Sequence, residues 1–471
     1  MRRYISPLCL LLSAVFALSS CVDEDEVEVT LYNDIAITAF QITSAKAERH
    51  TLSSTGEDSV FTVTDEMLKY YPFSIDHIKG EIFNTDSMPA GTDASKMLCS
   101  FSTRNNGVVV IENILNDSIK LLTTTDSTDF RVPRYLTVYS SDNSASRRYR
   151  VTVNIHRERE GVFGWNRLAD NGAFASMTGM RAVVLGGRMT VLGCEGGSTV
   201  IYSSSLDDGN TWTRSAATLG GDVYNNVAVR GDSLFVLDGG MLRASADGGS
   251  TFADVAPVAG VARLLGCSTA ELHAIGTDGT LMVSADGGRT WAHDAEDIDL
   301  DGGAPLMPSQ DITYCCTPFA YSDSTDYVLV AGNRSESGFP ADGNAVVLRK
   351  IAEYSHGSRP GRWISLGTDG SYAYRMPRLA GLSVFGYDGV MLAAGLGGIG
   401  TCTASPLSQI YESRDGGITW KASSTYVMPG GIDTAATSLA VTADAGGNVW
   451  LFCGGTGQVW RGRLSSFGWK K

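Results

Sequence analysis

An eight-residue pattern, S-x-D-x-G-x-T-[WF], occurs four times between residues 205 and 420 of this 471-residue chain. Its aspartates stand at positions 207, 247, 286 and 415, so the first three copies are 40 and 39 residues apart. A period near forty residues indicates a repeat architecture. The copies comprise Ser205, Asp207, Gly209 and Trp212; Ser245, Asp247, Gly249 and Phe252; Ser284, Asp286, Gly288 and Trp291; and Ser413, Asp415, Gly417 and Trp420.

Each copy has the chemistry of a tight turn between two strands. Serine and aspartate bond nearby backbone NH groups, glycine permits positive φ, and Thr-Trp begins a strand. Two apolar runs, 271–276 and 280–283, precede the third copy and are separated by an Asp-Gly turn. The two runs, the Asp-Gly turn, the repeated turn and the strand that follows it would form one antiparallel sheet unit. Turn chemistry therefore accounts for the aspartates and predicts an all-β fold.

The pattern resembles the Asp-box, or BNR repeat, of sialidase-like and related β-propellers, where it lies between the third and fourth strands of a blade. The resemblance implies a propeller over residues 161–471, with the boxes on its outer rim, away from the central pocket. Strand pairs and closing aromatic residues indicate six blades, or seven if the stretch 292–362 hides another. We expect residues 163–166 to supply the outer strand of the last blade and close the ring.

A second domain precedes the propeller. All eight tryptophans lie at or beyond Trp165, and only four of the 54 glycines precede Gly161. Residues 29–157 contain apolar runs, such as 135–139, that alternate with polar positions and are separated by polar turns. This pattern is typical of half-buried strands and predicts an immunoglobulin-like β-sandwich.

The start of the chain indicates export. Two arginines precede an apolar run at 8–18, which is too short to span a bilayer and is typical of a signal peptide. Residues 18–21 (LSSC) resemble a bacterial lipobox. The resemblance implies that residues 1–21 hold the signal and that Cys21 is lipidated, which would anchor the chain to the outer membrane on its surface or periplasmic face. A cleaved signal with an incidental cysteine is the alternative.

The charge of the chain restricts its partners. An acidic run at 22–28 resembles the surface-export tether of Bacteroidota-type lipoproteins, and a merely solvated linker is its alternative. The net charge of −14 makes nucleic acid a poor partner. The whole layout resembles a family of Bacteroidota lipoproteins without an assigned function.

One segment is similar to a catalytic motif. Residues 374–377 (YRMP) resemble the Y/F-R-I-P segment of sialidases, which implies that Arg375 clamps a substrate carboxylate at the propeller centre. The isoleucine is Met376 here, and the segment lies in the penultimate blade, whereas sialidases have it in the first. The alternative is that Arg375 and Pro377 only shape the entry to a blade.

A second segment has the spacing of a calcium loop. Asp297, Asp299 and Asp301 stand at alternate positions before Gly302, so their carboxylates could converge on Ca²⁺. Pro308 occupies the place of the usual glutamate, which argues against a helix-loop-helix calcium hand. An acidic solvated loop is the alternative. The histidines and cysteines have no zinc-ligand spacing, and no other cofactor is expected.

Seven cysteines remain after Cys9 and Cys21, so at least one is unpaired within the chain. Two of them, Cys315 and Cys316, are adjacent. We expect reduced thiols on opposite sides of a strand, with a vicinal disulfide as the alternative.

Two functions follow from these features. In the first, the sandwich is a spacer and the propeller is a non-catalytic platform that binds a glycan or a protein. In the second, the propeller is a sialidase-like exo-glycosidase that acts at its centre. We favour binding, because the repeat is architectural and the catalytic set is incomplete; three arginines, a tyrosine and carboxylates around Arg375 would favour the enzyme.

Overall fold

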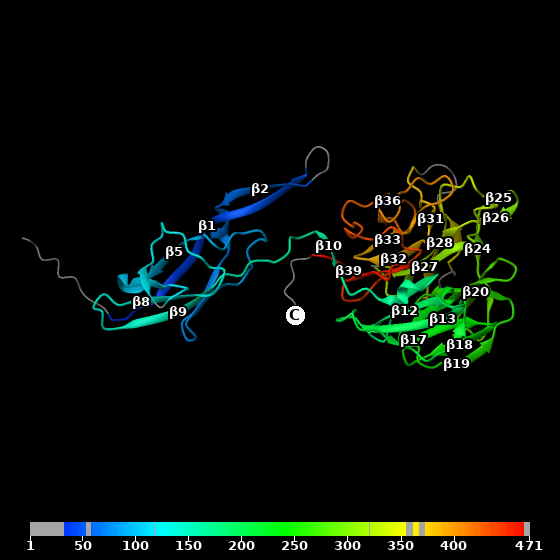
Figure 1. Ribbon diagram of the computed structural model, residues 1–471, viewed down its shortest axis with the longest axis horizontal. Helices are drawn as coiled ribbons and strands as arrows, with labels where there is room; N and C mark the ends of the chain where they lie inside the picture. The colour runs from blue at the N-terminus through cyan, green and yellow to red at the C-terminus, as the bar shows by residue number, and fades with distance from the viewer. Residues whose placement is uncertain are drawn as a thin grey trace, which may run out of the picture. The chain divides into compact units, whose positions relative to one another are not determined.

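The computed structural model describes residues 33–52, 58–116, 118–319, 321–354, 361–366 and 373–465. The predicted signal peptide, Cys21 and the acidic tether lie outside these residues. The chain divides into two compact units, residues 1–159 and 160–471 (Figure 1). Both consist mainly of strands, which confirms the all-β prediction; the α-helix α2 (Gly172–Ala175) has only one turn. Within the described ranges, no helix has both the length and the apolar character needed to cross a bilayer.

The N-terminal unit places two sheets over one core. The sheet orders are β2-β1-β5 and β3-β4-β9-β8-β6-β7, with β4 parallel to β9. Ile42 of β1 and Val151 of β9 are fully buried in the shared core, because alternate residues of a strand face the same side. The strands are β1 (Ile37–Leu52), β2 (Asp58–Asp65), β3 (Phe73–Asp76), β4 (Glu81–Asn84), β5 (Leu98–Thr103), β6 (Val108–Glu112), β7 (Ile119–Leu121), β8 (Arg134–Tyr139) and β9 (Ser146–Thr152).

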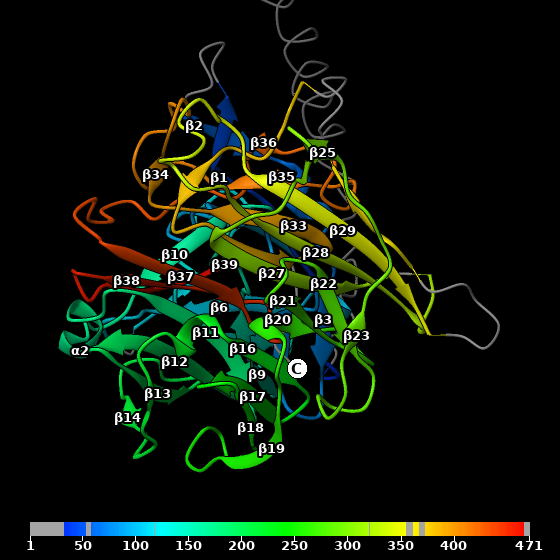
Figure 2. The ribbon, with the colours of Figure 1, turned by 90° about the vertical axis from the view of Figure 1, so that its right-hand side faces the viewer.

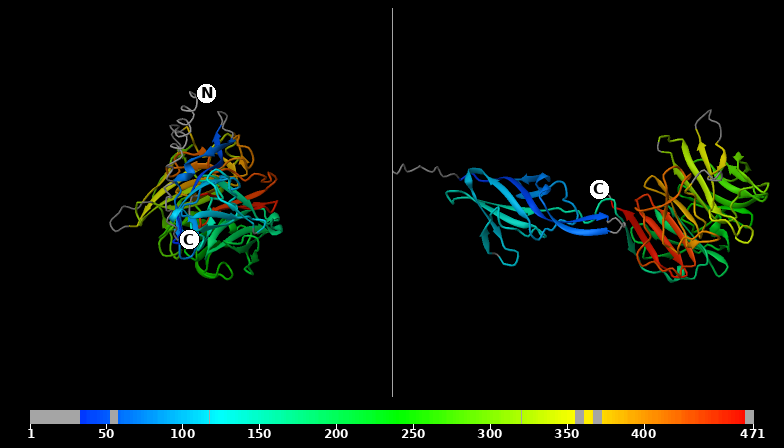
Figure 3. Two further views of the ribbon diagram at one scale, coloured as in Figure 1. Left: turned by 90° about the vertical axis from the view of Figure 1, so that its left-hand side faces the viewer. Right: turned by 90° about the horizontal axis from the view of Figure 1, so that it is seen from above.

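The long strand β1 joins two pairings. Its first half pairs with β5 and its second half pairs with β2. The register shifts between Ile37 and Ala39 and again between Ile42 and Ser44. These shifts lie on either side of Phe40, where the alternation of apolar and polar residues along the sequence changes phase. Such shifts bend a strand and let it serve two partners. Figure 3 shows the hairpin of β1 and β2 in blue.

The C-terminal unit contains six sheets of four or five strands in the described residues. In the first three sheets, consecutive strands pair antiparallel, and a copy of the repeated pattern forms the turn between the third and fourth strands. Their strands are β11 (Met180–Leu185), β12 (Arg188–Glu195), β13 (Ser198–Ser205), β14 (Thr213–Arg214) and β15 (Leu219–Gly220); β16 (Val227–Arg230), β17 (Ser233–Asp238), β18 (Met241–Ser245) and β19 (Ala253–Pro257); and β20 (Val261–Cys267), β21 (Leu272–Gly276), β22 (Leu281–Ser284) and β23 (Ala292–His293).

The other three sheets continue this arrangement. The fourth sheet lacks the repeated pattern but has the strands expected from its apolar runs, together with a short parallel edge strand, β24. The strands are β24 (Glu296–Asp297), β27 (Gln310–Pro318), β28 (Thr325–Asn333), β29 (Val346–Glu353) and β30 (Trp363–Ser365); β32 (Ser383–Tyr387), β33 (Val390–Ala394), β35 (Tyr411–Ser413) and β36 (Lys421–Ala422); and β37 (Ser438–Ala443), β38 (Val449–Gly454), β39 (Val459–Leu464) and β10 (Phe163–Arg167). Two short ladders, β25 (Leu300–Asp301) with β26 (Ala304–Pro305) and β31 (Leu379–Ala380) with β34 (Gly397–Gly398), lie outside these sheets.

The sixth sheet takes its outer strand from the start of the unit. Strand β10 pairs antiparallel with β39, from Phe163 opposite Leu464 to Arg167 opposite Trp460 (Figure 1). The predicted closing strand is therefore confirmed. Because the first and last strands of the unit share one sheet, backbone hydrogen bonds join the two ends of the unit.

The first strands of neighbouring sheets lie side by side. The amide of Leu264 on β20 donates to Oδ1 of Asn226, just before β16, at 3.0 Å. The amide of Val384 on β32 likewise donates to Oγ1 of Thr313 on β27 at 3.0 Å. Strand β37 contacts both β11 and β32, and Figure 2 shows the inner strands β11, β16, β20 and β27 gathered toward the middle of the unit. The inner strands therefore form a ring.

The cysteines of the described residues are all free thiols. Cys315 packs into the core between the fourth and fifth sheets, and Cys316 packs against the core between the third and fourth. Their side chains thus leave β27 on opposite sides, and burial raises the pKa of Cys315 to about 12. The structure agrees with two reduced thiols and not with a vicinal disulfide.

Candidate functional site

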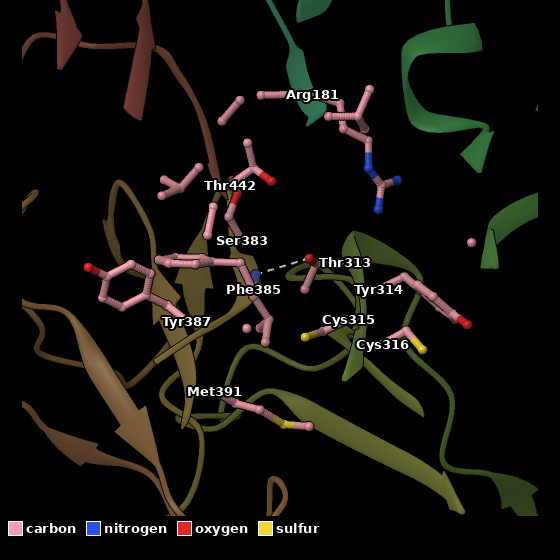
Figure 4. A pocket seen from close by; sticks show the side chains of 18 of the residues that line it. Arg181, Thr313, Tyr314, Cys315, Cys316, Ser383, Phe385, Tyr387, Met391 and Thr442 are labelled. Carbon is pink, nitrogen blue, oxygen red and sulfur yellow. Dashed lines mark hydrogen bonds between the residues drawn. The ribbon is translucent and has the colours of Figure 1, made fainter. Parts of the chain in front are cut away.

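A cavity of about 1380 Å³ runs through the ring of inner strands. Each of the six sheets contributes its first strand to the wall: β11, β16, β20, β27, β32 and β37. Side chains that point into the cavity therefore come from positions tens of residues apart along the sequence. Figure 4 shows part of this wall, with Arg181 of β11 across the cavity from Met391.

The wall combines small residues and hydroxyl groups. Thr313, Ser383 and Thr442 place hydroxyl groups along it, whereas the rings of Phe385 and Tyr387 are buried behind it in the core between the fifth and sixth sheets (Figure 4). Such a surface offers hydrogen bonds beside apolar groups, which is typical of sites for polar organic ligands.

Tyr314 lies across β20 because Gly266 leaves room for its ring. A Cβ at Gly266 would lie 2.1 Å from Cδ1 of Tyr314. The Tyr314 hydroxyl is 3.0 Å from Nδ1 of the fully buried His273, so it turns away from the cavity and into the interface between the third and fourth sheets. Burial raises the pKa of Tyr314. The group is therefore a neutral phenol that joins the wall to a buried polar network.

That network is built around a buried ion pair. Lys350 Nζ lies 2.8 Å from Oδ2 of Asp294 and 3.2 Å from Oε2 of Glu271. Trp363 donates from Nε1 to the same Asp294 oxygen at 2.7 Å. The imidazole of His273, whose Nε2 lies 3.4 Å from Oε2 of Glu271, lowers the pKa of Glu271, while burial lowers the pKa of His273 itself. No sequence pattern indicated this cluster, because its members lie on strands and loops that are far apart along the chain.

Arg181 has an unusual position at the cavity. Its half-buried side chain lines the wall, and it makes no hydrogen bond or ion pair with any residue that the structure describes. Burial, with a smaller contribution from the like charge of Arg263, lowers its pKa to about 10. The guanidinium therefore stays charged at neutral pH. It was not predicted from the sequence, although a charge in the apolar run Met180-Arg181-Ala182-Val183 is a usable signal.

The third copy of the repeated pattern shows how the turn is held. Ser284 Oγ donates to Oδ1 of Asp286 at 2.9 Å and accepts from the amide of Gly288 at 2.8 Å. The Asp286 carboxylate accepts from the amide and hydroxyl of Thr290, at 2.9 and 2.6 Å. Trp291 closes the turn by donating to the Gly288 carbonyl at 3.0 Å. The second and fourth copies repeat the serine and aspartate bonds, so turn formation accounts for these residues.

The glycine of each copy also contacts a neighbouring sheet. A Cβ at Gly288 would lie 2.0 Å from Leu242 of the second sheet, and one at Gly417 would lie 2.2 Å from Leu329 of the fourth. A Cβ at Gly209 would meet Trp450 of the sixth sheet at 2.6 Å. The pattern therefore fixes a turn within one sheet and packs that turn against another.

The first copy differs from the prediction. Asp208, not Asp207, accepts from the amide of Thr211, at 2.8 Å, and Ser204, not Ser205, accepts from the amide of Gly209, at 3.1 Å. The other copies have glycines with φ of +76°, +77° and +71° at the position of Asp208. A residue with a Cβ avoids this region, so the turn takes another path. The assignment of the bonding role to Asp207 is wrong.

The fourth copy lies nearer to the cavity than expected. The residues that line the cavity include Ser413, Arg414, Asp415 and Gly416, whereas none of the other three copies does so. The expectation that all four copies lie away from the central pocket is therefore corrected for the one at Ser413.

Arg375 does not lie where the sialidase resemblance puts it. It lines a second, smaller cavity of about 430 Å³, between the fourth and fifth sheets, and does not line the central one. Backbone bonds hold its segment there, because the amide of Ala345 donates to the Met376 carbonyl and the amide of Trp420 donates to the Tyr374 carbonyl. Arg334 is the other arginine of this cavity, and it is paired with Asp342 at 2.8 Å.

The predicted calcium ligands are not gathered into one site. Asp297 ends β24 and Asp301 ends β25, and Asp301 forms an ion pair with Arg334. The amide of Asp299 donates to Ser365 Oγ at 3.0 Å. The described residues contain no group of three or more His, Cys, Asp or Glu side chains arranged to hold a metal. Calcium at Asp297, Asp299 and Asp301 stays a prediction.

Comparison with known sequences gives the family. The model of the DUF6242 beta propeller domain matches residues 160–471, and that of the DUF6242 N-terminal domain, a domain of unknown function, matches residues 40–153. The chain belongs to the DUF6242 family. No curated protein matches this DUF6242 chain.

Solved structures resemble the DUF6242 chain only distantly. A structural genomics protein of unknown function from Bacteroides thetaiotaomicron has 10% identity and a TM-score of 0.41, over 92% of this chain and 98% of that one. The beta-propeller domain of Cps50 (Swd1) from Myceliophthora thermophila has 9% identity and a TM-score of 0.35, over 64% of this chain and 100% of that one. None of these similarities says what the DUF6242 propeller binds.

Proposed function

We propose that the propeller is a non-catalytic binding platform, on a chain anchored to the outer membrane through Cys21, and that it takes a glycan or a protein segment into its central cavity. One observation carries this proposal: a cavity of about 1380 Å³ is lined by the inner strands of all six sheets. Pockets for single small molecules measure roughly 300–1000 Å³, so this space fits an oligosaccharide or an extended peptide.

The groups that line the two cavities support ligand binding without catalysis. A sialidase-like mechanism would use a tyrosine as nucleophile, and no tyrosine is among the described residues that line the cavity of Arg375. In the central cavity, Tyr314 is a neutral phenol bonded to His273. Arg375 and Arg334 lie together outside the central cavity, and the described residues of their own cavity include only these two arginines. The requirement for three arginines, a tyrosine and carboxylates is unmet there.

The test combines a glycan array with a sialoside-hydrolysis assay. Thr442→Trp fills the cavity, whereas Thr213→Trp on the exposed outer strand β14 is the matched control. We expect the wild type and Thr213→Trp to bind the same glycans, Thr442→Trp to lose them, and none of the proteins to hydrolyse sialosides. Equal binding by both variants would place the ligand elsewhere. Hydrolysis that Arg375→Ala abolishes would replace the platform with a sialidase-like exo-glycosidase.

The anchor is tested separately. The proposal rests on the lipobox-like residues 18–21. We expect radiolabelled palmitate to enter the wild type and not Cys21→Ser, and protease added to intact cells to distinguish the surface from the periplasmic face. Unlabelled wild-type protein would contradict the lipid anchor.

A further inference from the structure

A positively charged position without a counter-ion lies at one mouth of the central cavity. Arg181 stands at the second position of β11, where the inner strands begin. Figure 4 shows its guanidinium extending on the side of Tyr314. Arginines that are removed from bulk water in folded proteins are normally paired, because desolvation of an unpaired charge is costly.

A second arginine lies near the first. Arg263, at the corresponding part of β20, has a buried Nε without a hydrogen-bond partner among the described residues. Among the described residues, the only hydrogen bond of the Arg263 side chain runs from Nη2 to the carbonyl of Ile312, at 3.4 Å. Burial lowers the pKa of Arg263, as it does that of Arg181, and the two like charges oppose each other. Both guanidinium groups therefore have unused donors.

The carboxylates nearest to this pair do not use those donors. Asp311, on the inner strand β27, accepts from Nδ2 of Asn333 at 2.9 Å and from the amide of Gly381 at 3.1 Å. Asp222, whose charge also reaches Arg263, is exposed to solvent. Neither aspartate forms an ion pair with Arg181 or Arg263 in the structure as described. Arg181 lines the central cavity and Arg263 does not, so the unused donors on the cavity side are those of Arg181.

We propose that Arg181, supported by Arg263, forms an anion subsite that binds the carboxylate of an acidic glycan in the central cavity. The inference rests on the proposed function, because it names the ligand class of the same cavity. A guanidinium suits a carboxylate, which it can bind through two parallel hydrogen bonds.

The wall beyond the subsite favours a sugar over an acidic peptide. The hydroxyl groups of Ser383 and Thr442, both partly exposed on the wall, match a ligand with many hydroxyl groups. The net charge of −14 repels a ligand with many acidic groups over the rest of the protein. A single local positive site selects for a ligand that carries its acidic group at the entering end.

The experiment measures binding of matched ligands by calorimetry. The probes are galacturonate and sialyllactose, which each carry a single carboxylate, their neutral counterparts (galactose and lactose), and a tri-glutamate peptide. The variants are Arg181→Gln, Arg181→Lys and, as control, Arg188→Gln on the neighbouring strand β12, where the arginine is exposed and bonded to Ser203. Thermal unfolding is followed for each variant.

We expect the wild type and Arg188→Gln to bind at least one carboxylated sugar and to prefer it over its neutral counterpart. Affinity should fall roughly 10-fold to 100-fold in Arg181→Gln, because a charge-assisted bidentate contact is lost, and less in Arg181→Lys. Unchanged or raised thermal stability in Arg181→Gln would separate ligand binding from a structural role, because the variant removes an uncompensated charge.

Several results would overturn the anion subsite. It fails if no carboxylated sugar binds, if Arg181→Gln binds as well as the wild type, or if tri-glutamate binds more tightly than the sugars. If neutral sugars bind and only Thr442→Trp loses them, the anion subsite is contradicted and the binding platform is supported. Failure of the platform itself would appear as glycan binding that Thr442→Trp does not change.

Discussion

Lys350 and Asp294 form an ion pair at 2.8 Å in which both side chains are buried between the third and fourth sheets. The pair links the two sheets, because Asp294 follows β23 whereas Lys350 lies on β29. Trp363 and Glu271 supply the remaining hydrogen bonds. The fourth sheet, which lacks the repeated turn, is thus joined to its neighbour by buried charge.

Removal of the lysine should be severely destabilising. Lys350→Met leaves the Asp294 carboxylate buried without its cation, and we expect the free energy of unfolding to fall by about 3–5 kcal/mol in urea denaturation. Arg167→Met removes an exposed ion pair with Asp170 and should cost less than about 1 kcal/mol. Equal losses in the two variants would contradict a special role for the buried pair.

The first repeated turn should depend on Asp208 and not on Asp207. Hydrogen bonds from Thr211 lower the pKa of Asp208. A carboxyl whose pKa is lower in the folded state adds stability above its unfolded pKa of about 3.9, and this stability is lost as the pH falls through the folded value. Asp208→Asn should therefore lower the melting temperature at pH 7 and flatten its decline in acid. If Asp207→Asn has the larger effect, the hydrogen bonds of this turn are assigned wrongly.

Gly288 should tolerate alanine less well than Gly248. Both have positive φ, +88° and +76°, so both substitutions carry the backbone penalty of about 1–2 kcal/mol. Only the Cβ at Gly288 meets a neighbour, Leu242, whereas the space around Gly248 is open within 4 Å. We expect Gly288→Ala to cost a further 1–3 kcal/mol or so in denaturant titration, as overpacked cores do. Similar losses would mean that the turn does not pack against the second sheet.

Phe163 should be required for closure of the ring. Its ring is 5.8 Å from that of Tyr387 and 5.5 Å from that of Tyr426, in edge-to-face contacts, and it is buried on β10. Phe163→Ala should lower the free energy of unfolding by about 3–5 kcal/mol and increase cleavage by protease near β10. Val162→Ala, at an exposed neighbouring position, is the control. Cleavage that rises equally in both would argue against closure through Phe163.

The fold was largely accessible from the sequence because its signals are local. The repeated turn needs serine, aspartate and glycine at fixed offsets, so the spacing of Asp247 and Asp286 revealed the repeat. The same logic failed at Asp207, since one glycine replaced by Asp208 changes the path of the turn without changing the visible pattern.

The cavity could not be predicted in the same way. Its wall combines single positions from six strands, and Arg181 and Arg263 are separated by an entire sheet in the sequence. The prediction from the YRMP segment that Arg375 lies at the propeller centre was wrong for a related reason. Backbone hydrogen bonds from Ala345 and Trp420 hold the segment outside the central cavity. Short motifs indicate local conformation, whereas a central site depends on how the six sheets are arranged around the cavity.

The pairing of β10 with β39 also constrains how the unit folds. Phe163 and its partner Leu464 are about 300 residues apart along the chain, so this contact is far less local than the pairings within the other five sheets. Until β39 has paired with it, β10 is open to pairing with other chains. Correct assembly of this propeller therefore depends on closing the ring before its first strand meets another molecule.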